Sequence, residues 1–221
     1  MLSICICSCL NNPDRKEYLK RCIDSIYNTF LENEVEILIG FDKYGAEIDG
    51  AKCHTHEKGM GHSWNWCIEN ATNDIILQTE DDWVIEIGGR NMERVPDKNS
   101  FFYHLNNRIK VIEEYGGMFK FTNIDDKFWT SGKTVRSLNG YNFKELNKPK
   151  TFMLNTWDMF IYSNQPHLKK KDFHKKVGFY LENVSVPEVE IDMCKKVYNS
   201  NERVFLNSFF TLVHIGFASS R

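Results

Sequence analysis

Apolar and polar positions along the first part of the chain follow the order strand, helix, strand. Apolar runs of strand length cover residues 2–9 and 35–41. Between them, residues 16–31 repeat apolar side chains at helical spacing, which predicts an amphipathic helix with one face in the core. The apolar positions of this helix are Leu19, Cys22, Ile23, Ile26 and Phe30. Strand, helix and strand in this order predict a βαβ unit, and therefore a parallel sheet with a right-handed crossover.

The pattern continues over the rest of the chain and becomes less regular after Tyr115. It predicts further strands at residues 51–56, 74–79, 118–122, 159–162 and 209–213. It predicts further helices at residues 64–71, 101–115 and 188–199. We therefore expect one α/β domain over residues 1–221, with a mostly parallel central sheet flanked by helices and a small mixed region on its second half.

The charge balance argues against a nucleic-acid partner. The chain has 28 Lys and Arg against 30 Asp and Glu, a formal net charge of -2. No overall positive field therefore exists to gather DNA or RNA. The basic run Lys169-Lys170-Lys171 is interpreted as a solvated face, with contact to a phosphate or an anionic acceptor as the alternative.

The cysteines and the N-terminal run favour a cytoplasmic protein. The apolar N-terminal run has no basic lead-in and ends at Asn11, so it predicts neither a signal peptide nor an integral membrane segment. The seven cysteines contain no C-x-x-C pair, which is typical of free thiols in a reducing compartment. We expect the cytoplasm, which for a viral chain would be the host cytoplasm.

Three consecutive acids, Glu80, Asp81 and Asp82, follow the predicted strand at 74–79. Ligands of open α/β sheets bind at the carboxyl ends of the strands, so these acids stand where chemistry is expected. Adjacent carboxylates repel one another, and a bound cation relieves that repulsion. Magnesium and manganese suit such oxygen ligands, commonly one or two carboxylates together with substrate phosphates. A solvated acidic turn is the alternative, but Trp83 would limit water at the cluster and favours the metal.

The order of these motifs resembles the inverting glycosyltransferases of family two and their relatives, which have the A-type (GT-A) fold. The resemblance covers roughly residues 2–85. Its motifs are Ser3-Ile-Cys-Ile-Cys-Ser8, Ile37-Leu-Ile-Gly-Phe-Asp42, Gly59-x-Gly61-x-x-x-Asn65 and Ile75-Ile-Leu-Gln-Thr-Glu-Asp-Asp82. The resemblance implies a nucleotide-sugar-binding half at about residues 1–95 and an acceptor-binding half at about residues 96–221.

The resemblance also implies roles for individual residues of the first half. The residues so implied are Ser8, Asp42, Asn65, Glu80 and Asp81 for the donor and Asp82 for the metal. By the match, Ser8 and Asp42 hold the nucleotide base, and Asp81 lies near the ribose. Glu80 departs from the family's D-x-D pattern, in which an aspartate comes first. Asp42 has a second interpretation, because Asp-Lys-Tyr-Gly is also an ordinary turn.

A helical segment at residues 185–196 carries the candidate base. Its acids favour the positive end of a helix dipole, which explains them without any catalytic role. The segment is also similar to the family's E-D-x-D-L-C motif, in which the second acid removes the proton of the acceptor hydroxyl. By that match Glu190 and Asp192 are the catalytic residues, with Glu190 as the general base and Asp192 as the acid that follows it. Glu188 and Asp158 remain alternatives for the base.

A late histidine and several residues of the second half complete the implied site. Related A-type enzymes place a C-terminal histidine on the metal, which by the match is His214. The segment from Tyr162 to Lys171 resembles the loop that follows the acceptor strand in the family. By that match, Trp157, Asp158 and Asn164 border the acceptor pocket. Trp129 is a further candidate, since aromatic faces stack on sugars. Core packing is the alternative for both tryptophans.

The sequence therefore predicts a metal-dependent, inverting glycosyltransferase. It would move a sugar from a nucleotide-diphosphate sugar to a hydroxyl of a glycan, glycolipid or glycoprotein. The expected cation is Mn²⁺ or Mg²⁺, and the expected donor is a UDP-sugar, with a GDP-sugar as the alternative. Two other functions stay open. A nucleotidyltransferase would want a Gly-rich, basic loop where this chain has Asn11-Asn12-Pro13, and a catalytically inactive carbohydrate-binding or scaffold protein of the same fold would bind no nucleotide.

Overall fold

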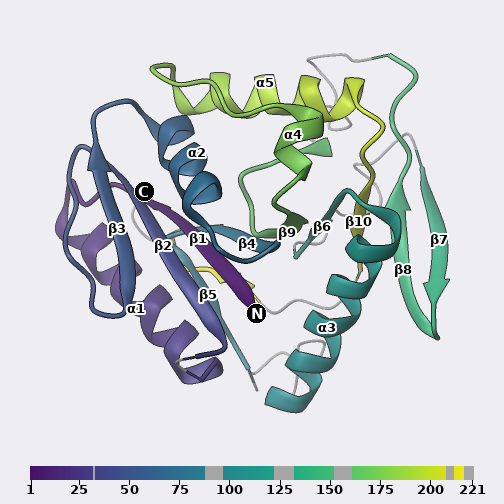
Figure 1. Ribbon diagram of the computed structural model, residues 1–221, viewed down its shortest axis with the longest axis horizontal. Coiled ribbons are helices and arrows are strands. Elements are labelled where there is room, and N and C mark those ends of the chain that lie inside the picture. Colours follow the sequence, from purple (N-terminus) through teal and green to yellow (C-terminus); the bar gives the residue numbers. More distant parts are fainter. Residues whose placement is uncertain (32, 88–96, 122–131, 152–160, 208–211, 217–221) are drawn as a thin grey trace.

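The computed structural model describes residues 1–31, 33–87, 97–121, 132–151, 161–207 and 212–216. A nine-stranded sheet in the order β3-β2-β1-β4-β9-β6-β10-β8-β7 runs through the molecule, with helices on both of its faces (Figure 1). A second, two-stranded sheet pairs β5 with β11. Within the described ranges, no helix is long and apolar enough to cross a membrane.

The elements have the following bounds. The strands of the large sheet are β1 (Leu2–Ser8), β2 (Val35–Asp42), β3 (Ala51–His56), β4 (Ile75–Glu80), β6 (Met118–Lys120), β7 (Lys133–Leu138), β8 (Tyr141–Leu146), β9 (His167–Lys170) and β10 (Val204–Leu206). The small sheet consists of β5 (Trp83–Ile85) and β11 (Leu212–His214). The helices are α1 (Pro13–Thr29), α2 (Met60–Asn70), α3 (Lys98–Tyr115), α4 (Phe173–Val177) and α5 (Val186–Asn199).

The large sheet is mixed, so the prediction of a mostly parallel sheet is wrong. The neighbours β3, β2, β1 and β4 are parallel, as the βαβ pattern indicates, and β6 is parallel to β10. The strand β9 runs antiparallel to both β4 and β6, and the β7–β8 hairpin adds to β10 in antiparallel orientation. Antiparallel neighbours need no crossover helix, so the alternation of strand and helix that reveals parallel strands is missing from the second half.

Two apolar clusters cover the two faces of the large sheet. Alternate side chains of β1 divide between them: Leu2, Ile4 and Ile6 join one cluster, whereas Cys5 and Cys7 join the other. Helices α1 and α3 pack into the first cluster, and α2 and α5 pack into the second. Both cysteines are free and buried, so they act here as small hydrophobic side chains.

Capping interactions set where α1 and α5 begin. The side chain of Asn12 accepts a hydrogen bond from the backbone N of Arg15 at 3.0 Å. At α5, the backbone N of Ser185 donates to Glu188 Oε2 at 2.8 Å, as part of a capping box. These starts place Arg15 and Glu190 early in their helices, where both enter the candidate site described below.

The structure confirms the elements that the apolar pattern predicts up to Tyr115, with shifts at their ends. It also confirms the strand predicted at 118–122, which is β6, and the helix predicted at 188–199. The strand predicted at 159–162 is wrong in its described part, since Ile161 and Tyr162 lie outside any strand. The pattern predicts none of the elements β5, β7, β8, β9, β10 and α4. The solvated-face interpretation is also wrong for Lys169, which is 0 % exposed on β9.

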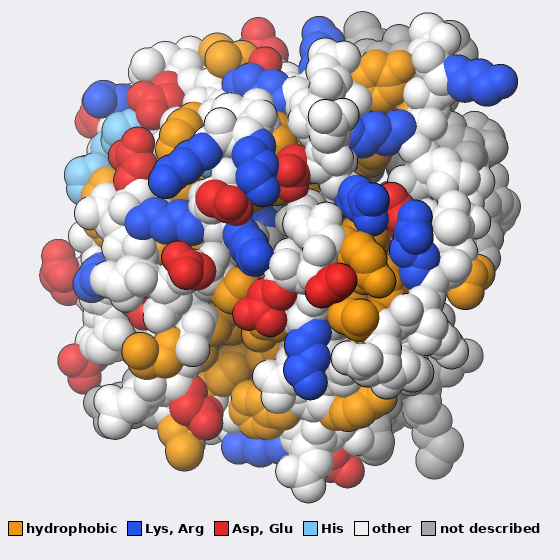
Figure 2. Space-filling view, turned by 45° about the vertical axis from the view of Figure 1, so that its right-hand side comes forward, with side chains coloured by type: hydrophobic (Ala, Val, Ile, Leu, Met, Phe, Trp, Pro, Cys, Tyr) orange, Lys and Arg blue, Asp and Glu red, His pale blue; other side chains and the backbone are white. Residues whose placement is uncertain are grey.

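Charged side chains of both signs are interleaved on the face shown in Figure 2. Ion pairs among the described residues also join charges of opposite sign: Lys176 lies 3.6 Å from Glu202, and Arg203 lies 3.6 Å from Glu145. This face therefore carries no extended field of one sign, in keeping with the near balance of basic and acidic residues in the chain.

Candidate active site

The candidate site is a cavity of about 300 Å³ at the carboxyl end of β4. It is lined by Glu80, Trp83, Asn164, Gln165, Val186, Glu190 and His214. These residues come from the end of β4, from β5 and β11, from the segment before β9 and from α5. The fold thus brings together four residues with predicted roles toward the donor, the metal, the acceptor and the transferred proton: Glu80, His214, Asn164 and Glu190.

Asp81 is a fully buried carboxylate with two partners. The hydroxyl of Ser8 donates to Asp81 Oδ2 at 2.6 Å, and Arg15 Nη2 lies 3.1 Å from Asp81 Oδ1. Ser8 ends β1 and Arg15 lies in the first turn of α1, so both partners come from the connection next to β4. Arg15 is absent from the predicted site. The one signal for it is a basic residue in the first turn of a helix, where the dipole favours acids.

Asp82 contacts residues from both ends of the chain. Arg15 Nη1 lies 3.0 Å from Asp82 Oδ2, and His214 Nε2 lies 3.2 Å from the same oxygen. The backbone N of Ile215 donates to the Asp82 carbonyl at 2.8 Å. A Cβ on Gly216 would lie 2.7 Å from Asp82 Oδ2, so the chain needs glycine to pass this close. The segment around β11 is therefore fitted against Asp82 and holds His214 on its carboxylate.

The Asp82 carboxylate fits a divalent cation. Its Oδ1 is buried and has no hydrogen-bond partner among the described residues, which leaves that oxygen for a cation. His214 adds a nitrogen beside the other oxygen. In the part of the chain that the structure describes, no three His, Cys, Asp or Glu side chains are arranged to hold a metal. One carboxylate and one imidazole are enough where substrate phosphates and water complete the coordination of Mg²⁺ or Mn²⁺.

The acids beside Asp82 hold protons more strongly than ordinary carboxylates. Loss of solvent, followed by the charges of Asp82 and Asp81, raises the pKa of Glu80 to about 8. Burial raises the pKa of Asp81 to about 6, against the opposing effects of Arg15 and Ser8. Burial thus favours the neutral form of both acids, and a divalent cation beside them would instead favour the charged form.

The acids of α5 differ in their contacts. Glu190 borders the cavity, and its Oε1 accepts a hydrogen bond from the backbone N of Asn164 at 3.1 Å. Asp192 Oδ2 lies 2.6 Å from Lys196 Nζ on the same helix and does not line the cavity. Glu188 is exposed and belongs to the capping box. Among the described candidates for the base, Glu190 is the one at the cavity wall.

Asp42 and Asn65 do not line this cavity. Asp42 ends β2, and its Oδ1 accepts a hydrogen bond from the backbone N of Gly59 at 3.2 Å. Asn65 is buried in α2 and exchanges two hydrogen bonds with the backbone of Tyr180, both of 3.0 Å. Asn65 therefore fastens α2 to the segment that leads into α5. The donor-binding roles of both residues stay predictions.

The acceptor side is described in part. Trp129, Trp157 and Asp158 lie outside the described residues, so their roles also stay predictions. Asn164 is 7 % exposed and lines the cavity. Its side-chain nitrogen lies 3.4 Å from Met60 Sδ, at the start of α2.

A buried polar network, which the sequence does not predict, lies behind Asn164. Lys169 Nζ donates to Gln78 Oε1 and, at 3.0 Å, to the hydroxyl of Tyr180. The hydroxyls of Tyr180 and Tyr162 are 2.7 Å apart, and Gln78 Nε2 donates to Tyr162 at 3.1 Å. The Tyr162 hydroxyl in turn donates to Asn164 Oδ1 at 3.4 Å. The network joins β4 and β9 to the wall of the cavity and orients Asn164.

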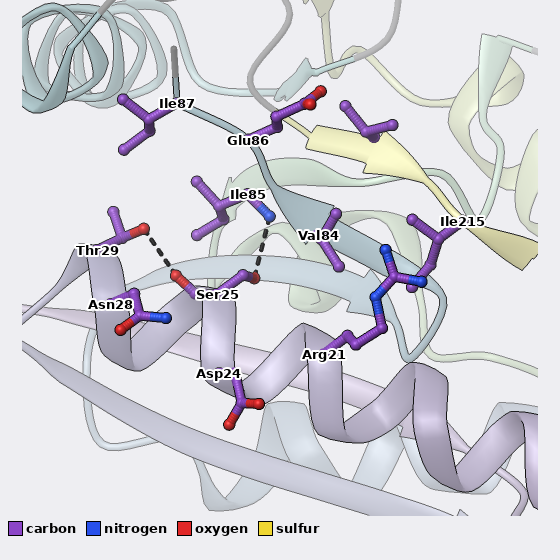
Figure 3. Close-up of a pocket in the computed structure, with 11 residues that line it drawn as sticks. Arg21, Asp24, Ser25, Asn28, Thr29, Val84, Ile85, Glu86, Ile87 and Ile215 are labelled. Atoms are coloured by element: carbon purple, nitrogen blue, oxygen red, sulfur yellow. Dashed lines mark hydrogen bonds between the residues drawn. The ribbon is translucent and has the colours of Figure 1, made fainter. Parts of the chain in front are cut away.

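A larger cavity, of about 600 Å³, lies between α1 and the small sheet (Figure 3). Arg21 reaches across it from α1 toward Val84 and Ile215. The hydroxyl of Ser25 accepts a hydrogen bond from the backbone N of Ile85 at 3.0 Å and so ties α1 to β5. None of the predicted site residues lines this cavity, so the smaller one is the candidate active site.

Comparison with known proteins places the fold. No family model and no curated protein matches the chain. S. aureus TarS 1–349 in complex with UDP-GlcNAc is similar at a TM-score of 0.56 and 14 % identity, over 94 % of this chain and 56 % of that one. The mannosyltransferase PcManGT from Pyrobaculum calidifontis, in complex with GDP-Man and Mn²⁺, is similar at a TM-score of 0.53 and 11 % identity, over 94 % and 56 % of the two chains. The chain thus spans little more than half the length of these proteins, and it shares with them a mixed α/β fold whose large central sheet is flanked by helices.

Proposed function

We propose that this chain is a glycosyltransferase that moves a sugar from a nucleotide-diphosphate sugar to a hydroxyl of a carbohydrate or glycoconjugate acceptor. The observation that carries the proposal is the cavity in which Glu80, Glu190 and His214 meet beside Asp82. Carboxylates and an imidazole from three parts of the chain converge there. The fold shared with a mannosyltransferase bound to GDP-Man and Mn²⁺, and with a protein bound to UDP-GlcNAc, supports the same class of substrate.

The donor would bind along the ends of β1, β2 and β4. Asp82 and His214 would hold a divalent cation, Mn²⁺ or Mg²⁺, which when bound neutralises the charge of the leaving diphosphate. Asp81 would meet the ribose, as the family resemblance implies, with its carboxylate held by the hydroxyl of Ser8. Asp42 would meet the base, since it follows Phe41, the residue paired with Ser8 across β1 and β2. We propose a UDP-sugar as the donor, with a GDP-sugar as the alternative.

Glu190 is the general base of the proposed reaction. Its carboxylate takes the proton of the acceptor hydroxyl while the hydroxyl oxygen forms a bond to the anomeric carbon of the donor. The bond from that carbon to the diphosphate oxygen breaks on the opposite face, and the diphosphate leaves with the electron pair, which inverts the configuration. The hydrogen bond from the backbone N of Asn164 holds the Glu190 carboxylate at the cavity wall for this step.

Calorimetry and a nucleotide-release assay test this function. UDP and GDP are titrated with and without Mn²⁺, and a panel of nucleotide sugars is assayed for release of the nucleoside diphosphate. We expect Mn²⁺-dependent binding of one nucleotide and release from its sugars. Asp82→Asn should weaken that binding by about 10–100-fold, whereas Asp24→Asn, an exposed acid on α1, should match the wild type.

The same experiment separates the alternatives. A wild-type protein that binds neither nucleotide would contradict the proposal and leave a carbohydrate-binding scaffold. With nucleoside triphosphates added to the assayed panel, release of pyrophosphate from them would indicate a nucleotidyltransferase. Full Mn²⁺-dependent binding by Asp82→Asn would show that the metal does not use this carboxylate.

A further inference from the structure

Arg15 brings a positive charge from the surface into the candidate donor site. Its Nη2 lies 3.1 Å from Asp81 Oδ1 and its Nη1 lies 3.0 Å from Asp82 Oδ2, so one planar guanidinium bridges two carboxylates. The side chains of Asp81 and Asp82 are 0 % and 10 % exposed, whereas that of Arg15 is 28 % exposed. The acids are thus fixed within the fold, and the arginine is the member of the group with room to move.

A permanent structural ion pair is the simpler interpretation, and the arrangement at Asp82 argues against it. Arg15 and His214 both approach Asp82 Oδ2. Oδ1 of the same carboxylate is buried without a hydrogen-bond partner among the described residues. The large majority of buried polar atoms are hydrogen-bonded, so an ion pair with Arg15 alone does not explain the unpartnered Oδ1. Oδ1 of Asp82 is therefore available to a ligand, and the proposed function assigns a divalent cation to this same carboxylate.

Cation and arginine cannot both use Asp82 without cost. Two positive charges beside one carboxylate repel each other, and a site with little water screens that repulsion weakly. Arg15 starts from the first turn of α1, next to the positive end of the helix. A diphosphate beside Asp82 would lie within reach of this side chain, and a guanidinium binds phosphate oxygens through two parallel hydrogen bonds. Arg15 therefore has a second anion to go to once a donor is bound.

We propose that Arg15 is an exchangeable counter-cation, which neutralises Asp81 and Asp82 while the site is empty and moves to the donor's diphosphate when a divalent cation takes Asp82. The inference rests on the proposed function, because it needs Asp82 as the cation ligand and a nucleoside diphosphate beside it. Arginine and cation then compete for one carboxylate and together bind one diphosphate. Removal of Arg15 should therefore strengthen the binding of Mn²⁺ alone and weaken the binding of the nucleotide.

Calorimetry on Arg15→Gln measures both affinities, the one for Mn²⁺ alone and the one for the nucleotide. The first titrant is Mn²⁺ alone, and the second is UDP at saturating Mn²⁺, with GDP in its place if that is the nucleotide that the wild type binds. We expect Arg15→Gln to bind Mn²⁺ alone about tenfold more tightly and the nucleotide about tenfold more weakly than the wild type. Arg15→Lys keeps the positive charge but lacks the planar guanidinium, so both of its affinities should lie between those of the wild type and Arg15→Gln. Arg21→Gln, further along the same helix and outside the acidic cluster, is the matched control and should match the wild type.

Thermal unfolding gives a readout that needs no nucleotide. Without Arg15 the cation is the remaining counter-charge for Asp81 and Asp82, so Mn²⁺ should raise the melting temperature of Arg15→Gln more than that of the wild type. If Arg15→Gln does not fold without Mn²⁺, Arg15→Lys carries the comparison. It should also bind Mn²⁺ more tightly than the wild type, because its ammonium cannot bridge both acids.

The outcomes separate this inference from the function on which it rests. Equal or weaker Mn²⁺ affinity in both Arg15 variants would overturn the inference, and so would unchanged nucleotide affinity. A wild type that still binds the Mn²⁺–nucleotide complex would leave the proposed function in place in either case. A wild type that binds no nucleotide at all would contradict the proposed function first and the inference with it.

Discussion

Glu190 and its neighbours on α5 allow proton transfer to be tested apart from helix stability. Glu190→Gln keeps the shape of the side chain and an oxygen that can accept the hydrogen bond from Asn164, but it cannot take a proton. We expect kcat for sugar transfer to fall by about 10²–10⁴-fold, the usual contribution of a general base. The Mn²⁺-dependent affinity for the nucleotide should stay at the wild-type value, because the substitution leaves Asp81 and Asp82 untouched. Steady-state kinetics and calorimetry measure the two quantities.

Two substitutions on the same helix are the controls for Glu190. Asp192→Asn removes the pair with Lys196, and Glu188→Gln keeps an oxygen for the capping box. Both variants should keep the wild-type kcat. If Glu190→Gln kept it as well, the base would have to be another residue, and Asp158 would be the next to replace.

Residues of the site that belong to a contiguous motif could be predicted from the sequence, and residues brought in by packing could not. Glu80, Asp82 and His214 each stand at the end of an apolar run, where a ligand-binding residue is expected. Arg15 contacts Asp82, which lies 67 positions away in the chain, and its neighbour Asp81. Its contact depends on where the N-cap of α1 starts the helix relative to the end of β4. No local pattern in the sequence contains that relation.

At the scale of elements, β9 shows why the second half of the sheet escapes prediction. Its four residues contain two lysines, so the segment reads as polar although it lies between β4 and β6 in the middle of the sheet. Lys169 is buried because Gln78 and Tyr180 receive its hydrogen bonds. A strand whose polar groups are satisfied by partners far along the chain has no apolar signature. The longer parallel strands β1, β2 and β4 bury apolar runs and are predicted for that reason.

The buried amine of β9 leads to a prediction about alkaline stability. Burial lowers the pKa of Lys169 well below its ordinary value, so the unfolded chain binds a proton that the folded chain releases. The Lys169 amine should therefore make a contribution to the free energy of unfolding that rises with pH below the unfolded value of about 10.4, and Lys169→Met should lack this contribution. The difference between wild type and variant should change by up to about 1.4 kcal/mol per pH unit in favour of the wild type. Urea unfolding of both proteins between about pH 7 and about pH 9.5 measures that difference.

Lys169→Arg is a useful companion to Lys169→Met. It keeps a group that stays charged at these pH values, so it should be destabilised without showing the same slope. A difference between wild type and Lys169→Met that does not depend on pH would mean that the folded protein keeps the Lys169 amine protonated.

At the scale of the whole molecule, the similarity of fold covers more of the chain than the sequence motifs do. The sequence motifs cover roughly residues 2–85, whereas the structural likeness to TarS covers 94 % of the chain. The first part consists of parallel strands connected by helices, and the spacing of apolar residues predicts the order of these elements. The second part uses short strands and a hairpin, such as β9 with four residues and β10 with three. Their positions are set by contacts across the sheet, which a single sequence does not display.

Four histidines that are buried or partly buried set the response of the whole molecule to acid. Burial lowers the pKa of His56 and His104 to about 4, and it lowers the pKa of His167 and His174 well below the ordinary value. The unfolded chain therefore binds more protons than the folded chain once the pH falls below about 6.5. Each such histidine removes up to about 1.4 kcal/mol from the free energy of unfolding per pH unit between about pH 6.5 and pH 4.

The acidic cluster opposes this loss, and the comparison of the two predicts the effect of Mn²⁺ on acid stability. The raised pKa values of Glu80 and Asp81 let the folded chain take up protons before the unfolded chain does, which favours the fold as the pH falls. Four histidines outweigh two acids, so the free energy of unfolding should fall from about pH 6.5 to about pH 5, as measured by urea unfolding. Saturating Mn²⁺ should make that fall steeper, because a cation on the cluster lowers the pKa of both acids and removes the opposing contribution. A slope that Mn²⁺ leaves unchanged would place the cation away from Glu80 and Asp81, while a free energy that stays level in acid would show that the buried imidazoles are protonated in the folded protein.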